Sequence, residues 1–416
     1  MSRVGQRVSM DPRPKRRVAM LAYTHYRSDP RVRREAEALV KAGHAVTVFC
    51  LEDDAASTMI DGVTVAGIFP ARYRGGNALA YVLNYARFFR AAANALRWHH
   101  RQQSFDLVQV HTMPDFLVFA AAALKRDGVP LLLDIHDLMP ELFESKFGLS
   151  ERHPVARLLR WQERRSARFA HRCLAVHRRH GRLLAQRVGE DVTIDVIHNL
   201  PDPRWFPLAP PAECAGDSIR IVYHGTIAHR HGIEVAVRAM HRIHAQFPTT
   251  RLEVFGDGDA APAVAALIRQ LDASSYIRFQ PGVVPIERLV PALQGAGIGV
   301  IPLLEDRFTN YMLPTKLLEY VAMGVPVICS DLLSVRDYFS EHQVRYVTPG
   351  DADDLAAALR HLLSDSRLRR QLATAARVFY DRENWSSEER AYVGIVEAMI
   401  AGASERSAHA VDRSVA

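Results

Sequence analysis

Residues 311–327 read YMLPTKLLEYVAMGVPV and run on into the apolar pair IC. Proline is favoured in the first turn of a helix and threonine can cap one, so we predict a helix that begins at Pro314 and Thr315. Gly324 predicts the end of that helix, and the apolar residues that follow Pro326 are typical of a buried strand. A helix that passes directly into a buried strand indicates an α/β core.

The same stretch places Lys316 and Glu319 three residues apart, and therefore on one face of the predicted helix. The backbone N–H groups of a helix N-terminus and an ammonium group attract phosphate, and a carboxylate can accept hydrogen bonds from two ribose hydroxyls. The pattern therefore predicts a nucleotide site. The alternative is an ordinary ion pair on an amphipathic helix, worth about 0.5 kcal/mol.

Short apolar segments alternate with helical patterns along the whole chain. Such alternation predicts parallel sheets with helices on both faces. We expect two Rossmann-like, doubly wound domains, because the segments form two series with a proline-rich stretch between them. The first series is 18–22, 45–49, 107–110 and 130–134, and the second is 219–223, 252–255, 297–301 and 325–328.

The proline-rich stretch, NLPDPRWFPLAPP, holds five prolines among thirteen residues and cannot continue a helix or a central strand. We place the linker there, and expect the polar, aperiodic ends of the chain to be disordered. The predicted division is a basic tail 1–16, a first domain 17–198, a linker 199–211, a second, nucleotide-binding domain 212–384, a helix 385–402 and a tail 403–416. Ligands of doubly wound sheets bind beyond the carboxyl ends of the strands, so we expect the chemistry in a cleft between the two domains.

The chain carries 53 Lys and Arg against 46 Asp and Glu, a net charge of +7. Residues 1–200 hold 31 of the basic and 20 of the acidic residues, which predicts that the first domain meets an anionic partner. Two segments, 72–101 and 152–172, mix arginine with aromatic residues at helical spacing. We predict either helices packed on the core or helices that rest on an anionic membrane.

No apolar run reaches the length of a membrane span, and the first seventeen residues lack the apolar middle of a signal peptide. The four cysteines show no C-x-x-C spacing, which is typical of reduced core residues. We therefore expect a cytoplasmic protein, with the inner face of the membrane as the place of any peripheral contact.

Residues 133–141, LDIHDLMPE, follow a predicted strand at the edge where sheets of this kind gather catalytic groups. His136 is the catalytic candidate of the first domain. Its ring can donate a hydrogen bond to a sugar hydroxyl, and its backbone carbonyl can stabilise positive charge at an anomeric carbon. A metal site built on His136 and His111 would need further ligands at matching strand ends, and we expect no metal.

A glycine turn follows the first strand of the second domain. The backbone of Gly225 and Thr226 can approach a phosphate closely, and Arg230 or His231 can add positive charge. This turn is a second candidate for the phosphate end of the nucleotide site.

Gly256, Asp257 and Gly258 end the next strand and suit a base or ribose that passes close to the backbone. After the first strand of the chain, residues 23–31 contain no glycine, so a dinucleotide cofactor held there by G-x-G-x-x-G is not expected. Asp29 is predicted to cap the next helix, whose opening RVRR either guides an anion or is a surface charge cluster.

Taken together, these motifs resemble glycosyltransferase family 4, the retaining nucleotide-sugar transferases of GT-B fold. The segments that carry the resemblance are 43–48 (GHAVTV), 105–111 (FDLVQVH), the His136 segment, 199–207 (NLPDPRWFP), the Gly225 turn, 256–258 (GDG), 314–326 and Trp385 at the head of the last predicted helix. The resemblance covers nearly the whole chain. The resemblance implies a GT-B fold, with an acceptor-side domain 17–198, a nucleotide-sugar-binding domain 212–384 and a last helix that crosses back to the first domain.

The resemblance also implies roles for individual residues. Glu319 would bind the nucleotide ribose, Lys316 would lie near the diphosphate and His136 near the donor sugar. The predicted catalytic residues are His136, Lys316 and Arg230, and the predicted nucleotide-sugar-binding residues are Gly225, Thr226, His231, Gly256, Asp257, Gly258, Tyr311, Leu313, Pro314, Thr315 and Glu319.

Two positions depart from the family pattern. Tyr311 lies eight residues before Glu319, where the family has a glutamate that binds the donor sugar, and Thr226 stands where a basic residue is expected. Candidate substitutes for the glutamate are Glu305, Asp306 and backbone N–H groups near residue 310. The departures are typical of a sub-branch with the pattern P-x-K-x-x-E-Y, and they leave the identity of the donor open.

The sequence thus predicts a retaining, metal-independent glycosyltransferase that moves a sugar from a nucleoside diphosphate to a lipid-linked, polysaccharide or small-molecule acceptor. The nucleotide sugar is a co-substrate, and no cofactor or nucleic-acid partner is expected. Two alternatives stay open. One is a nucleotide-sugar epimerase on a similar fold, and the other is a non-catalytic subunit that kept the fold and lost the donor-sugar acid.

Overall fold

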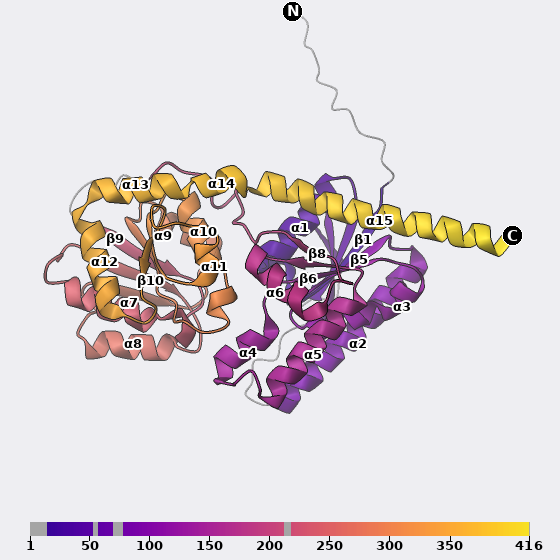
Figure 1. The fold of residues 1–416 in the computed structure, drawn as a ribbon, viewed down its shortest axis with the longest axis horizontal. Coiled ribbons are helices and arrows are strands. Elements are labelled where there is room, and N and C mark those ends of the chain that lie inside the picture. Colours follow the sequence, from indigo (N-terminus) through magenta and orange to yellow (C-terminus); the bar gives the residue numbers. More distant parts are fainter. Residues whose placement is uncertain (1–14, 53–56, 70–77, 212–217, 416) are drawn as a thin grey trace, which may run out of the picture. The chain divides into compact units, whose positions relative to one another are not determined.

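The computed structural model describes residues 15–52, 57–69, 78–211 and 218–415 (Figure 1). The chain divides into two compact units. Unit 1 comprises Met1–Ile135, Arg165–Cys173 and Glu389–Ala416, and unit 2 comprises His136–Arg164 and Leu174–Glu388. Most of the predicted basic tail, Cys214 and the start of the arginine- and aromatic-rich segment 72–101 lie outside the described residues.

Unit 1 is built on a parallel sheet. Its elements are β1 (Arg17–His25), η1 (Tyr26–Ser28), α1 (Pro30–Lys41), β2 (Ala45–Leu51), β3 (Ser57–Ile60), β4 (Val63–Phe69), α2 (Ala78–Gln102), β5 (Leu107–His111), η2 (Asp115–Ala121), α3 (Ala122–Arg126) and β6 (Leu131–Ile135). The strand order in unit 1 is β3-β4-β2-β1-β5-β6. Of the next two strands along the chain, β7 (Arg172–Ala175) starts in unit 1 and ends in unit 2, and β8 (Ile194–Val196) belongs to unit 2. Strand β1 pairs in parallel with β2 and β5, while β3 is antiparallel to β4. All four predicted strand segments of the first series are present.

Helix α1 begins as predicted, because the Asp29 carboxylate accepts a hydrogen bond from the Val32 backbone N–H at 3.2 Å. Its arginine-rich opening is divided between surface and core. Arg33 is partly exposed and forms ion pairs with Glu37 and Asp61, both at 2.7 Å, which agrees with a surface charge cluster. Arg31 is buried, and its guanidinium donates to both carboxylate oxygens of Asp134, at 2.7 and 2.8 Å. A buried guanidinium needs such a bidentate partner to offset its lost hydration.

The last helix, α15 (Trp385–Val415), starts at the predicted residue and is longer than expected. Residues 403–415, which we expected to be disordered, continue the helix. Neither proline nor glycine occurs after Gly402 to end it.

From Glu389 onward, α15 belongs to unit 1. The Tyr392 hydroxyl donates to the Gln109 side-chain oxygen at 2.6 Å, and Lys41 forms an ion pair with Glu389 at 3.0 Å. These contacts place the C-terminal helix on the unit that holds the N-terminal strands. Within the described residues, no helix combines the length and apolar character needed to cross a bilayer.

Unit 2 contains a second parallel sheet and the helices around it. Its elements are α4 (Met139–Phe147), α5 (Pro154–Phe169, the last five residues in unit 1), α6 (Arg178–Val188), β9 (Arg220–His224), η3 (His229–His231), α7 (Ile233–Ile243), β10 (Arg251–Gly256), α8 (Ala261–Gln270), β11 (Ile277–Pro281), α9 (Ile286–Leu293), β12 (Ile298–Ile301), η4 (Thr309–Tyr311), α10 (Thr315–Ala322), β13 (Val327–Ser330), α11 (Leu333–Arg336), β14 (Arg345–Val347), α12 (Ala352–Ser364), α13 (Ser366–Ala376) and α14 (Val378–Arg382). The strand order is β11-β10-β9-β12-β13-β14.

Two apolar clusters cover the two faces of this sheet, as side chains that alternate along a strand require. In β9, Ile221 and Tyr223 belong to the cluster formed with α7, α8 and α12, whose helices are labelled around β9 and β10 in Figure 1. Val222 belongs to the cluster formed with α9, α10 and α11. The second doubly wound sheet predicted from the sequence is therefore confirmed.

The stretch 199–211 contains no helix or strand and packs against the end of α10. The Ala209 N–H donates to the Ala322 carbonyl at 2.8 Å. Gly324 follows the end of α10 with φ +69°, and a Cβ there would lie 2.2 Å from the Pro210 carbonyl oxygen. Gly324 therefore both ends the helix, as predicted, and makes room for the proline-rich stretch.

Gly299 in β12 allows α10 to pack closely on the sheet, because a Cβ there would lie 2.5 Å from Cδ2 of the buried Tyr320 ring. Gly299→Ala should therefore lower the free energy of unfolding by about 1–3 kcal/mol, measured by urea denaturation. The control is Gly394→Ala in α15, where nothing lies within 4 Å of the added Cβ. That change should be neutral or stabilise by up to about 1 kcal/mol. Equal effects of the two changes would contradict the prediction.

Candidate functional site

A cavity of about 420 Å³ lies within unit 2, beyond the carboxyl end of β9 and beside the start of α10. It brings together ten of the predicted site residues: His136, Gly225, Thr226, His231, Tyr311, Leu313, Pro314, Thr315, Lys316 and Glu319. Four others are not among its lining residues: Arg230, Gly256, Asp257 and Gly258. The pocket therefore contains the start of α10 and the Gly225 turn, which lie about ninety residues apart in the sequence.

The start of α10 differs in one detail from the prediction. Pro314 occupies the capping position with extended backbone, Thr315 is the first helical residue, and no side chain accepts a hydrogen bond from the first turn. Thr315 is therefore not the cap. An uncapped helix N-terminus directs partial positive charge at the pocket that Thr315 and Lys316 line.

Lys316 is held by an aromatic side chain of the sheet below it. Its ammonium donates to the Tyr223 hydroxyl at 2.8 Å and lies 4.4 Å from the centre of the same ring. The Tyr223 hydroxyl in turn donates to the Thr226 carbonyl at 2.7 Å. The pKa of Lys316 is lowered to about 8, chiefly by burial; the Glu319 carboxylate opposes this shift and the Arg230 charge adds to it. The ammonium is fixed but poorly solvated, so it can bind an anion strongly.

Glu319 is oriented by a histidine that the family motif does not include. His224 Nε2 lies 2.5 Å from a Glu319 carboxylate oxygen, and its Nδ1 lies 3.0 Å from the Tyr320 hydroxyl. An ionised carboxylate can only accept, so Nε2 carries the proton that His224 donates to Glu319. The arrangement fixes the carboxylate at the pocket wall before any ligand arrives.

Of the two predicted basic residues of the Gly225 turn, His231 lines the pocket without charge, and Arg230 lies outside the lining but close enough for its charge to lower the pKa of Lys316. Burial, together with the Lys316 charge, lowers the pKa of His231 to about 3, and its Nδ1 donates to the Thr226 carbonyl at 2.5 Å. His231 is therefore a neutral wall of the pocket. The Arg230 guanidinium lies 5.4 Å from the centre of the Phe308 ring, outside the lining residues. Among the described residues that line the pocket, Lys316 is the one lysine or arginine.

The segment Gly256-Asp257-Gly258 lies outside the lining residues and packs against the Gly225 turn. A Cβ on Gly256 would lie 1.8 Å from the Gly225 carbonyl oxygen, and one on Gly258 would lie 2.3 Å from the Ile227 carbonyl oxygen. The Ile227 N–H donates to the Asp257 carbonyl at 2.8 Å. These glycines let the Gly225 turn pack against the end of β10, which explains their presence without direct ligand contact.

The loop that leads to α10 carries Tyr311 and is held by two side chains that donate hydrogen bonds to its backbone. His177 Nε2 donates to the Tyr311 carbonyl at 2.7 Å, and the Ser334 hydroxyl donates to the Met312 carbonyl at 2.6 Å. Burial lowers the pKa of His177 to about 4, so this donor stays neutral at physiological pH. The backbone of the loop is therefore fixed at Tyr311 and Met312.

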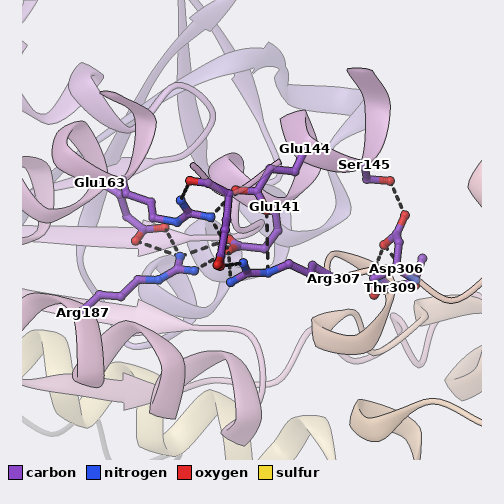
Figure 2. Close-up of polar contacts among 10 residues, drawn as sticks. Glu141, Glu144, Ser145, Glu163, Arg187, Asp306, Arg307 and Thr309 are labelled. Atoms are coloured by element: carbon purple, nitrogen blue, oxygen red, sulfur yellow. Dashed lines mark hydrogen bonds and ion pairs between the residues drawn. The ribbon is translucent and has the colours of Figure 1, made fainter. Parts of the chain in front are cut away.

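The acids proposed to replace the missing glutamate serve this loop instead. The Asp306 carboxylate accepts hydrogen bonds from the Thr309 N–H, at 2.7 Å, and from the Ser145 hydroxyl (Figure 2). Glu305 accepts from the Asn310 side chain at 3.1 Å. Neither Glu305 nor Asp306 lines the pocket.

Asp137 is a pocket residue that the sequence analysis did not select. It lines the same cavity as His136, and burial raises its pKa while the His136 and Arg230 charges oppose that shift. Its position next to His136 after a predicted strand was the available signal. His177, His180 and His224 also line the pocket, but no spacing in the sequence marks them.

One cluster outside the pocket has the composition of a metal site. His198, Glu383 and Glu388 place ligand atoms within 4.8 Å of one another. His198 already pairs with Glu388 at 2.8 Å through Nδ1 and with the Tyr338 hydroxyl at 2.8 Å through Nε2. These bonds account for the cluster as a buried polar contact without an ion.

Two parallel-sheet α/β folds with a polar pocket at the strand ends define a protein of the GT-B class. Solved structures agree in fold. Sucrose-phosphate synthase from Thermosynechococcus elongatus has a TM-score of 0.76 at 18% identity, over 93% of this chain and 100% of that one. Anabaena HepE in complex with UDP-glucose has a TM-score of 0.68 at 12% identity, over 92% of this chain and 99% of that one.

Family models narrow the class. Residues 28–200 match the model "Glycosyl transferase 4-like domain" and residues 218–365 match "Glycosyl transferases group 1". The chain belongs to glycosyltransferase family 4. A phosphatidyl-myo-inositol mannosyltransferase of Mycolicibacterium smegmatis is 30% identical over 159 residues, which is 38% of this chain and 39% of that protein. The match thus spans about two fifths of the curated relative.

Lys316 is placed for ligand binding at the expense of stability, because its pKa of about 8 lies below the value of 10.5 for a solvated lysine. The folded state disfavours the charged form, so Lys316→Met should raise the free energy of unfolding at pH 7 by up to about 3 kcal/mol. The gain should shrink as the pH rises from 8 toward 10, where wild-type Lys316 is neutral when folded. Lys316→Arg, which stays charged, should not stabilise. A Lys316→Met protein that is less stable than wild type in urea at pH 7 would contradict this account.

Proposed function

We propose that this protein is a retaining glycosyltransferase that binds a nucleoside-diphosphate sugar in the pocket of unit 2. It transfers the sugar to a lipid-linked, polysaccharide or small-molecule acceptor. One observation carries the proposal. Lys316 and Glu319, on one turn of α10, line the same cavity as the Gly225 turn, and each is held in place by its own partner.

At the phosphate end, the ammonium of Lys316 and the uncapped N-terminus of α10 face the pocket. Both attract the negative charge that develops on a leaving nucleoside diphosphate. A divalent ion performs this task in many transferases, and here the two protein groups take that role. Transfer should therefore proceed without a metal.

At the ribose end, Glu319 is the carboxylate that His224 orients. A fixed carboxylate can accept hydrogen bonds from both hydroxyls of a ribose without paying the cost of ordering itself on binding. The apolar wall formed by Val284, Ile286 and Leu289 lines the same pocket and suits a flat base.

At the sugar end, Tyr311 cannot accept hydrogen bonds as a carboxylate would, and Glu305 and Asp306 lie elsewhere. Asp137 is the one carboxyl group besides Glu319 among the described lining residues. We assign to it the sugar-hydroxyl contacts of the absent glutamate. His136, beside it, then faces the anomeric carbon with its backbone carbonyl or ring.

The relatives support this donor class. HepE is described in complex with UDP-glucose, and the mycobacterial relative is named a mannosyltransferase that acts on phosphatidyl-myo-inositol. A uridine nucleotide is therefore the first probe to use, with other bases beside it. A lipid-linked acceptor would also suit a cytoplasmic protein that works at the inner face of the membrane.

Substitutions of Lys316 and Glu319 should separate the catalytic step from nucleotide binding. Once thermal shifts with a panel of nucleotide sugars have identified the donor, Lys316→Ala should lower kcat by at least about a hundredfold. Glu319→Ala should chiefly raise KM. The control removes a surface ion pair of the same unit, Arg242 with Asp353, which is joined at 3.1 Å and should leave both constants unchanged.

The same assay tests the other parts of the proposal. EDTA should not change the rate, and NMR of the product should show the anomeric configuration of the donor. Full dependence on a divalent ion, or an inverted product, would place the protein in another mechanistic class. Conversion of the nucleotide sugar without an acceptor would indicate an epimerase. Nucleotide binding without any turnover would indicate a non-catalytic subunit.

The second prediction concerns pH. UDP-glucose affinity, measured by calorimetry, should be nearly constant from pH 6.5 to 7.5 and weaken as the pH rises through about 8, because Lys316 then loses its proton in the free protein and the diphosphate of UDP-glucose does not titrate in this range. Lys316→Arg should remove this break, since arginine stays charged. His231, with its pKa near 3, cannot produce it. A break of the same size in Lys316→Arg would assign the effect to another group.

A further inference from the structure

Helix α5 (Pro154–Phe169) presents an unusual outer face. Leu158 and Trp161 are 59% and 55% exposed. Four exposed arginines lie on the same face, because they are spaced by three, four or seven residues from these two apolar side chains: Arg157, Arg164, Arg165 and Arg168. We call these six residues the α5 face.

The opposite side of α5 holds its one acidic residue. Glu163 is buried and pairs with Arg187 at 3.1 Å, and Arg187 also pairs with Glu141 of α4 (Figure 2). Arg160 turns to the same side and pairs with Glu144. Glu141, Glu144 and Glu163 are therefore paired on the buried side of the helix, and none of the six residues of the α5 face is acidic.

We propose that the α5 face docks on the surface of a bilayer that contains anionic phospholipid. A helix lying in the plane of a membrane places tryptophan and leucine among the upper acyl chains. Arginine side chains extend beside them, keep their guanidinium groups at the lipid phosphates and cover apolar surface with their methylene groups. The face provides both contacts over about 16 Å from Arg157 to Arg168.

A lipid surface fits better than the other anionic partners. Nucleic acid would use the arginines and the flat ring of Trp161, but it gains nothing from an exposed leucine. An acidic protein would need a carboxylate pattern that matches four arginines around a central apolar pair. A fluid bilayer adapts to that spacing, because its headgroups move to the charges. Docking on lipid does not depend on glycosyl transfer.

The test is sedimentation of the full chain with phosphatidylcholine vesicles that contain, or lack, phosphatidylglycerol. Wild-type protein should bind the anionic vesicles and not the neutral ones. Changing the four arginines of the α5 face to glutamine should weaken binding at least about a hundredfold, since each contributes roughly a factor of five. The double change Leu158→Ala and Trp161→Ala should weaken it about tenfold, and should do so equally at high salt, where charge contributes little.

A matched control separates the face from the net charge. Arg238, Arg269, Arg367 and Arg370 are exposed on other helices of unit 2, so their replacement by glutamine removes the same charge elsewhere. This control should bind like wild type. Brominated lipid should quench a tryptophan signal that is missing in Trp161→Phe.

Two results would overturn the proposal. Equal loss of binding in the control and in the α5 variant would reduce the effect to net charge. Failure of the wild type to bind anionic vesicles would reject lipid and leave an acidic protein as the partner. Far-UV circular dichroism of each variant excludes misfolding, and because the changed side chains are exposed the melting temperatures should stay close to wild type.

Discussion

The ammonium of Lys316 on the hydroxyl of Tyr223 is the contact on which the site depends. Tyr223 lies next to the end of the buried strand β9, and its hydroxyl donates a hydrogen bond to the Thr226 carbonyl. The lysine, the strand and the turn are therefore linked by a continuous chain of hydrogen bonds. Gly225 lies beside the chain, and a Cβ there would be 3.3 Å from Lys316 Cε. The position of the cation therefore depends on backbone that only glycine makes available.

Two neutral histidines line the pocket together with the Lys316 ammonium. Burial keeps the pKa values of His177 and His231 far below neutrality, so both act as hydrogen-bond donors of fixed direction rather than as charges. Arg230, outside the lining, already lowers the pKa of Lys316, and a second cation within the cavity would lower it further. Because the two histidines carry no charge, the ammonium and the N-terminus of α10 provide the attraction for an anion, and so direct the proposed diphosphate to one end of the pocket.

The sheets, the α10 helix and ten of the pocket residues could be predicted because their signals are local. Apolar runs mark strands, and a proline followed by a lysine and a glutamate three residues apart marks a helix with one polar face. Contacts between distant residues could not be predicted. Arg31 and Asp134 are 103 residues apart in the sequence, and His177 and Tyr311 are 134 residues apart. No sequence pattern marks either pair. Arg230 shows the converse failure, since its position in the turn was predictable and its orientation onto the Phe308 ring was not.

In the first 200 residues, the number of basic side chains is a weak guide to the exposed positive charge, and their burial and pairing are a better one. Arg31, Arg160 and Arg187 form ion pairs with buried or half-buried carboxylates and hold α1, α4 and α5 in place, so they project little positive field. The same pairing removes Glu163 from the surface of α5. These three arginines pair with five carboxylates, those of Glu35, Asp134, Glu141, Glu144 and Glu163. Structural ion pairs thus take more acids than bases, and arginines remain exposed on one helix face beside leucine and tryptophan. A uniformly basic surface would attract any polyanion, whereas cations gathered around an apolar centre favour a partner that offers negative charge and hydrocarbon at the same depth.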